Sequence, residues 1–167
     1  MTATSTTESP SPDELRKAQD GATLRIRDLA LIEDVVLEPG GGLLVLTGET
    51  GAGKSILLGG LALLAGQRAA LDQVRAGADE AVIEGAFGLD GIPDLAALLA
   101  GEGLEIEEGD LVARRTLGAS GSRAYVNDRL VTVRTLRELG DGLVEIAGQH
   151  ESQRLLRGSE QLELLDR

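Results

Sequence analysis

The segment LLVLTGETGAGKSILLGGLALL, residues 43–64, decides the expected fold. Its centre fits the phosphate-binding pattern G-x-x-x-x-G-K-[ST] and reads Gly48-Glu49-Thr50-Gly51-Ala52-Gly53-Lys54-Ser55. The apolar run Leu43–Thr47 before it is typical of a buried strand, and Ile56–Ala65 after it is typical of a buried helix. A strand, a glycine-rich loop and a helix in this order predict a P-loop.

The residue types in this motif predict binding of ATP with Mg²⁺. Gly48, Gly51 and Gly53 allow positive φ and a close approach of backbone N–H groups to phosphate oxygens. Lys54 is one of only two lysines in the chain and places a point charge on the β- and γ-phosphates. The Ser55 hydroxyl is a natural ligand for Mg²⁺. The alternative is an ordinary strand-to-helix turn, since the chain has 23 glycines.

Length and composition place narrow bounds on the rest of the function. The 167 residues predict one domain, and residues 1–21, rich in Ser, Thr and Pro, predict a disordered tail. The chain has no cysteine and one histidine, which excludes thiolate and histidine-cluster metal sites. The absence of a signal pattern or a long apolar run predicts a cytoplasmic protein with no membrane contact. A net charge of −12 gives no general attraction to nucleic acid.

Periodicity and turn residues predict an α/β chain around the P-loop. Gly59 and Gly60, inside the P-loop helix, predict close packing of that helix on the sheet. Thr132 or Thr135 is the expected N-cap of a helix that ends near Gly140. The other expected strands are Leu24–Leu29, Ile32–Glu38, Ala81–Leu89, Leu111–Leu117, Ser122–Asn127, Leu130–Val133 and Leu143–Ala147, and the other expected helices are Pro93–Ala100 and a last one capped by Ser159.

The catalytic apparatus for hydrolysis is incomplete in this sequence. No run of four apolar residues followed by Asp or Glu occurs after Lys54, so the second acidic residue that normally helps to hold Mg²⁺ is missing. Gln149 follows a predicted strand, where its amide can reach Mg²⁺ or the attacking water. It is equally a common loop residue, and the single histidine, His150, is either a sensor of the γ-phosphate or a structural residue.

Arginines gather between residues 111 and 137 against a single acid, Asp128. A basic segment in an acidic chain is a candidate contact for DNA phosphates, although a solvated face paired with acids elsewhere fits the same pattern. The six arginines are Arg114, Arg115, Arg123, Arg129, Arg134 and Arg137.

Four stretches of the chain together resemble one known family. LRIRDLALI (24–32), GETGAGKSILL (48–58), SRAYVNDRLVTV (122–133) and IAGQHESQRLL (146–156) are similar to the N-terminal head segment of the RecN family, the SMC-like DNA repair ATPases. The resemblance implies that residues 22–167 form the N-terminal half, lobe I, of an ABC-type ATPase head. It implies a mixed sheet with β-hairpin elements packed on the P-loop helix, and a chain that stops where a coiled coil begins.

The resemblance also implies roles and partners. Residues Gly48–Ser55 correspond to Walker A, and Gln149 corresponds to the Q-loop glutamine, so Lys54 and Gln149 are the expected catalytic residues and Ser55 and Gln149 the expected metal ligands. ATP is then held between two heads in a homodimer, and a C-terminal half of the same head supplies Walker B. The signature motif of the second head completes hydrolysis. The resemblance thus implies a nucleoid-associated ATPase in double-strand-break repair and recombination, inactive in this fragment alone.

Two alternatives remain open from the sequence. One is the ATP-binding subunit of an ABC transporter, which usually carries an aromatic residue upstream of the P-loop, whereas no aromatic precedes Phe87 here. The separation of Lys54 and Gln149, about 95 residues, is also roughly double the transporter spacing. The other alternative is a module that binds nucleotide or DNA without hydrolysis.

Overall fold

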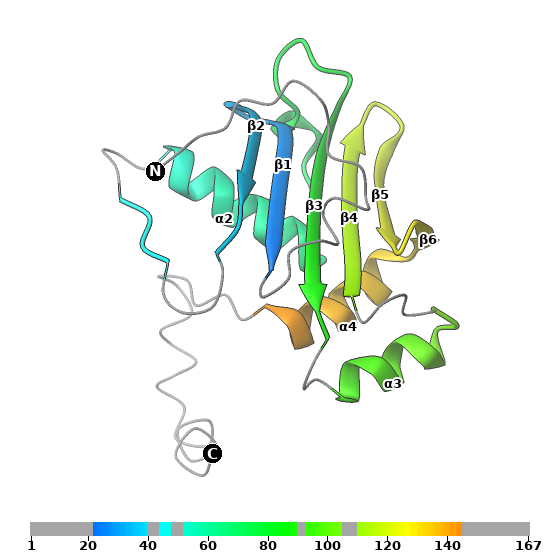
Figure 1. Cartoon of the computed structure of the whole chain (residues 1–167). Helices are drawn as coiled ribbons and strands as arrows, with labels where there is room; N and C mark the ends of the chain where they lie inside the picture. Colours follow the sequence, from blue (N-terminus) through cyan, green and yellow to red (C-terminus); the bar gives the residue numbers. More distant parts are fainter. Residues whose placement is uncertain (1–21, 40–43, 48–51, 90–92, 105–109, 145–167) are drawn as a thin grey trace, which may run out of the picture.

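The computed structural model describes residues 22–39, 44–47, 52–89, 93–104 and 110–144. Within them, one six-stranded sheet has the order β2-β1-β3-β4-β5-β6 (Figure 1). The strands are β1 (Thr23–Leu29), β2 (Ile32–Leu37), β3 (Glu80–Gly88), β4 (Asp110–Gly118), β5 (Gly121–Val126) and β6 (Arg129–Val131), and the helices are α2 (Ala52–Leu64), α3 (Pro93–Gly101), α4 (Val133–Leu143) and the short 3₁₀ helix η1 (Leu71–Gln73).

All strand pairings in this sheet are antiparallel, so the expectation of a mixed sheet is wrong for the residues that the structure describes. The hairpins themselves are confirmed. Gly121, with φ of +102°, starts β5 after the turn from β4. Asn127 and Asp128 both have positive φ, 46° and 62°, as a two-residue turn between right-twisted strands requires.

The core lies between one face of the sheet and the helices α2 and α4, which Figure 1 shows on the same side of the strands. Because side chains alternate along a strand, every second residue points into this layer. Ile26, Ile83, Leu111, Leu117 and Val126 are all fully buried there. Full burial of side chains of this size contributes roughly 1.5–3 kcal/mol each before entropy is counted.

The predicted strand Leu43–Thr47 is not found. Residues 44–47 have neither helix nor strand geometry, and Leu44, Val45 and Leu46 are 48%, 66% and 39% exposed. A strand needs a neighbour for its backbone hydrogen bonds, and none of the described strands pairs with this run. The apolar run therefore has no strand to pair with among the described residues.

Helix α4 begins as predicted and ends later than predicted. Thr132, not Thr135, is the N-cap, and its Oγ1 accepts a hydrogen bond from the Thr135 backbone N–H at 3.0 Å. Leu143, predicted to open a strand, is the last helical residue, and Val144 is the C-cap. The remainder of that predicted strand, the tail 1–21 and the helix capped by Ser159 lie outside the described residues.

The prediction that small residues let the P-loop helix pack closely holds for Gly60 but not for Gly59. A methyl group on Gly60 would overlap Ile26 Cδ1 of β1, whereas a methyl group on Gly59 would meet no atom of the described residues within 4 Å. Of the helices that the structure describes, none is long and apolar enough to cross a membrane.

These two glycines give a matched pair of variants. Gly59→Ala should raise the free energy of unfolding by roughly 0.5–1 kcal/mol, because alanine restricts the unfolded chain and favours helix. Gly60→Ala should lower it, because the fully buried Ile26 has to leave its rotamer. Urea unfolding of both variants measures the two signs, and equal stabilisation by both would contradict the close packing.

Candidate functional site

The first turn of α2 brings Lys54 and Ser55 to one end of the helix. Lys54 is partly buried and Ser55 is exposed. This turn carries no acidic residue, so the partial positive charge of the helix N-terminus is not offset within it. Backbone N–H groups, an ammonium group and a hydroxyl meeting at such an end are suited to bind a phosphate with its metal ion.

Gly53 does not have the positive φ that the sequence predicts for it. It is a helical residue of α2 and is not among the glycines with positive φ. A methyl group at Gly53 would meet none of the described residues within 4 Å. Of the other predicted site residues, Ala52 begins α2, and Gly48, Glu49, Thr50, Gly51, Gln149 and His150 lie outside the described residues.

The opposite end of α2 closes in a Schellman motif. The Gly66 N–H donates to the Leu63 carbonyl at 3.1 Å, and the Gln67 N–H donates to the Ala62 carbonyl at 3.0 Å. Gly66 takes a φ of +79°, which a residue with a side chain rarely adopts. Its carbonyl oxygen then accepts two hydrogen bonds from Arg137 of α4, at 3.3 Å from Nε and 3.0 Å from Nη2.

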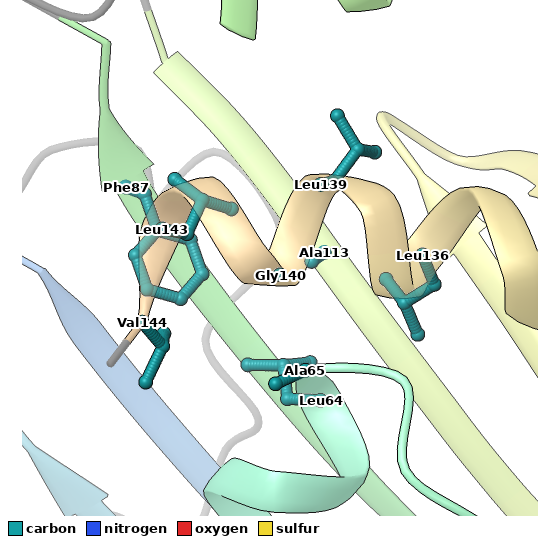
Figure 2. Close-up of a pocket in the computed structure, with 9 residues that line it drawn as sticks. All are labelled: Leu64, Ala65, Phe87, Ala113, Leu136, Leu139, Gly140, Leu143 and Val144. Atoms are coloured by element: carbon teal, nitrogen blue, oxygen red, sulfur yellow. The ribbon is translucent and has the colours of Figure 1, made fainter. Parts of the chain in front are cut away.

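Figure 2 shows how closely α4 crosses this end of α2, with Gly140 facing Ala65 and Leu64. A void of about 10 Å³ remains between them, lined entirely by apolar side chains and Gly140. It is far smaller than a nucleotide pocket, for which several hundred Å³ is usual. The void is therefore a packing defect of the core and no ligand site.

The six arginines of the predicted basic patch do not form one surface. Arg114 lies on the face of the sheet away from α2 and α4, which we call the outer face. This face carries Arg25, Arg27, Glu84, Arg114 and Arg123, together with the residues paired with them on adjacent strands. Arg114 pairs with Asp128 at 2.7 Å and with Glu84 at 3.5 Å, and its guanidinium lies 4.9 Å from the centre of the Tyr125 ring. It is therefore already engaged within the protein.

Arg115, next along β4, points the other way and is buried with 2% of its surface exposed. Its Nε donates to the Ser122 hydroxyl at 2.7 Å, and its Nη1 has no hydrogen-bond partner among the described residues. Burial lowers the pKa of this guanidinium, and the nearby positive charge of Arg137 lowers it further. Arg115 is excluded as a DNA contact.

Two further arginines of the patch act as caps of helix C-termini. Arg137 binds the Gly66 carbonyl at the end of α2, and Arg129 binds the Gly103 carbonyl just beyond α3. Cations are favoured at this end of a helix because the carbonyl groups there lack partners within the helix. The sequence analysis did not predict that Arg129 and Arg137 bind helix ends. A glycine shortly after each predicted helix did indicate where the helix ends, but not which side chain binds there.

The two remaining arginines are exposed and held weakly. Arg134 pairs with Glu138 one turn along α4 at 2.8 Å, and this hydrogen bond raises the pKa of its guanidinium. Arg123 donates to the Ser120 hydroxyl at 3.3 Å. Surface contacts of this kind contribute little to stability, so both side chains can exchange them for another partner.

The outer face is electrically mixed, not basic. It has a hollow of about 290 Å³ in which Arg27, Arg114 and Arg123 stand among Glu80 and Glu84. Beside the hollow, Arg25 is buried and forms a two-pronged ion pair with Asp34, at 3.0 Å from Nε and 2.6 Å from Nη2. This hydrogen-bonded pair raises the pKa of Arg25. Because acids accompany the arginines, this face lacks the one-sided charge that attracts DNA.

Comparison with known proteins identifies relatives of most of the chain. It is 41% identical over 147 residues to the DNA repair protein RecN of Bacillus subtilis, and the aligned residues cover 87% of this chain and 26% of that protein. It is 43% identical over 145 residues to RecN of Streptomyces coelicolor, which covers 86% of this chain and 25% of that protein. This chain is homologous to the N-terminal quarter of RecN. No family model matches it.

Solved structures show that the fold is that of an SMC ATPase head. A structure from work on ATP-driven dimerization and DNA-stimulated activation of SMC ATPases matches with a TM-score of 0.62 and 19% identity, over 88% of this chain and 98% of that chain. The Smc head bound to the C-terminal winged-helix domain of ScpA matches with a TM-score of 0.57 and 21% identity, over 76% of this chain and 41% of that chain. The expected SMC-like head is therefore confirmed at the level of fold, as is the similarity to RecN.

Proposed function

We propose that this chain is the ATP-binding lobe of a RecN-like ATPase that acts in the repair and recombination of broken DNA. The observation that carries the proposal is the placement of Lys54 and Ser55 in the first turn of α2, a turn that carries no acidic residue. Homology to RecN over most of the chain favours this function over that of a transporter ATPase.

The described residues fit an ATP·Mg²⁺ complex. The ammonium group of Lys54 neutralises charge on the β- and γ-phosphates, and the N-terminal amides of α2 add to the same field. Ser55, exposed at the helix start, is the residue that would hold Mg²⁺ in this lobe, together with Gln149. Bound Mg²⁺ neutralises negative charge that develops on the phosphate oxygens.

Hydrolysis requires groups beyond this chain. The chain spans about a quarter of the length of the RecN proteins that it matches. The exposed apolar segment at Leu44, Val45 and Leu46 supports a missing partner, because three large apolar side chains in a row are costly to leave in water. We assign the C-terminal half of the same head to that place, and a second head in a homodimer to the completion of the ATP site.

Titration calorimetry with ATP·Mg²⁺ tests the proposal directly. This chain alone should bind the nucleotide without turnover, and the full-length protein should hydrolyse it. Turnover by this chain alone would mean that it is a complete small ATPase. Absence of binding in both proteins would overturn the proposed function.

Of the six arginines, we propose a DNA contact only for Arg123 and Arg134, which are exposed and form weak surface contacts. Changing both to glutamate should lower the affinity of the full-length protein for DNA and make log affinity fall less steeply with log salt, by about one unit of slope for each phosphate that is no longer neutralised. The matched variant Arg123→Gln plus Arg134→Gln should have an intermediate effect, since it removes charge without reversing it. An unchanged affinity and slope in the glutamate variant would exclude both residues.

A further inference from the structure

Arg137 binds the end of α2 that lies opposite to Lys54 and Ser55. Its guanidinium donates two hydrogen bonds, of 3.0 and 3.3 Å, to the single carbonyl oxygen of Gly66. The contact joins residues 71 positions apart in the chain, so it fixes α2 to α4 and not to its own neighbours. A positive group at this position also matches the negative end of the helix dipole.

The backbones of the two helices touch at the same place. A methyl group on Gly66 would come to 2.6 Å from Arg137 Cα, and one on Gly140 would come to 2.7 Å from Ala65 Cα. At these two points backbone faces backbone, so no flexible side chain acts as a spacer. The end of α2 therefore cannot move along its axis unless α4 moves with it.

Close packing alone does not require an arginine at position 137. Its charge lies near the buried guanidinium of Arg115, whose Nε donates to a neutral hydroxyl. Burial lowers the pKa of Arg115, and the charge of Arg137 lowers it further. Residue 137 is exposed, so packing of the core does not call for a charged side chain at this position. The two hydrogen bonds to the Gly66 carbonyl are therefore what an arginine adds at this position.

We propose that Arg137 is a positioning residue that sets the axial position of the P-loop helix, and with it the place of Lys54 and Ser55. The inference rests on the proposed ATPase function of that site. Helix α2 has 13 residues and is a stiff rod of about 20 Å, so a displacement at Gly66 is passed on to its first turn. A misplacement of about 1 Å in a catalytic group costs on the order of 100-fold in rate.

The test compares Arg137→Met with Arg129→Met in the full-length protein, without DNA. Arg129 caps α3 in the same way through Gly103, and α3 carries none of the candidate site residues. We expect Arg137→Met to lower kcat for ATP hydrolysis about 10-fold while KM changes less than about 3-fold, because the phosphate-binding turn moves as one body. Arg129→Met should leave both constants within about 2-fold. Arg137→Lys should restore part of kcat, since its ammonium can still donate to the Gly66 carbonyl.

Hydrogen–deuterium exchange of the α2 amides tests the same inference without any turnover. Exchange at residues 53–66 should accelerate in Arg137→Met and remain unchanged in Arg129→Met. Equal losses of kcat in the two methionine variants, or unchanged exchange in α2, would overturn the positioning role. If the unmodified protein neither binds nor hydrolyses ATP, the proposed function fails, while the exchange pattern still decides whether Arg137 positions the helix.

Discussion

Replacing Lys54 with alanine is expected to lower ATP turnover by the full-length protein at least about 100-fold. The lysine is the one cation in the first turn of α2. In the proposed ATP complex, its loss would leave backbone amides and the metal ion as the groups of this lobe that neutralise the β- and γ-phosphates. Because the charge that it offsets grows as the γ-phosphoryl group leaves, kcat should fall more than nucleotide affinity. Steady-state kinetics together with nucleotide titration separates the two effects.

Two further variants make this result specific. Lys54→Arg should also be severely impaired, because a planar fork does not replace a compact ammonium group against phosphate oxygens. Arg129→Ala removes the same unit of charge far along the chain, at the end of α3, and should leave kcat within about 2-fold. A Lys54→Ala protein with near-normal kcat would place the reaction elsewhere in the molecule.

Those parts of the fold that local chemistry determines were predictable from the sequence. The hairpin of β4 and β5, the turn at Asn127 and Asp128, and the N-cap at Thr132 each depend on residues within a few positions of one another. The helix after the P-loop motif was also predicted, and its start at Ala52 shows that the motif residues Gly53, Lys54 and Ser55 are themselves helical.

The predicted strand Leu43–Thr47 is wrong over its described residues, 44–47, and the reason is non-local. Its apolar residues satisfy the pattern of a buried strand, but a strand exists only where another chain segment supplies hydrogen bonds. A run of apolar residues predicts that a segment is buried, but it does not identify the segment that packs against it. The exposure of Leu44, Val45 and Leu46 thus supports the proposal that the C-terminal half of the head covers this segment.

The arginine patch shows a second limit of sequence reasoning. Arg114 and Arg115 are neighbours in the chain, yet strand alternation sends one to the outer face and the other into the core. Arg129 and Arg137 are bound to helix ends that lie 26 and 71 positions away. A local count of charge contains none of this information, because the partners are chosen by the tertiary fold.

The crossing of α2 and α4 leads to the largest expected change in stability. Gly140→Ala should lower the free energy of unfolding by about 2 kcal/mol, even though alanine is the better helix former by roughly 1 kcal/mol. The added methyl group would lie 2.7 Å from Ala65 Cα and 2.9 Å from the Ala65 carbonyl oxygen. These are backbone atoms, which cannot rotate away, so the helices must separate and loosen the packing of Leu136 and Leu139, which are buried in the same layer.

Gly142→Ala on the same helix is the matched control. A methyl group there would meet Leu95 Cδ1 at 3.6 Å, an ordinary van der Waals contact, so the substitution should stabilise the chain by roughly 0.5–1 kcal/mol. Urea unfolding of both variants under the same conditions gives the sign of each change in the free energy of unfolding. Stabilisation by Gly140→Ala would mean that the two helices have room to part, and the tight joint between α2 and α4 would then be incorrect.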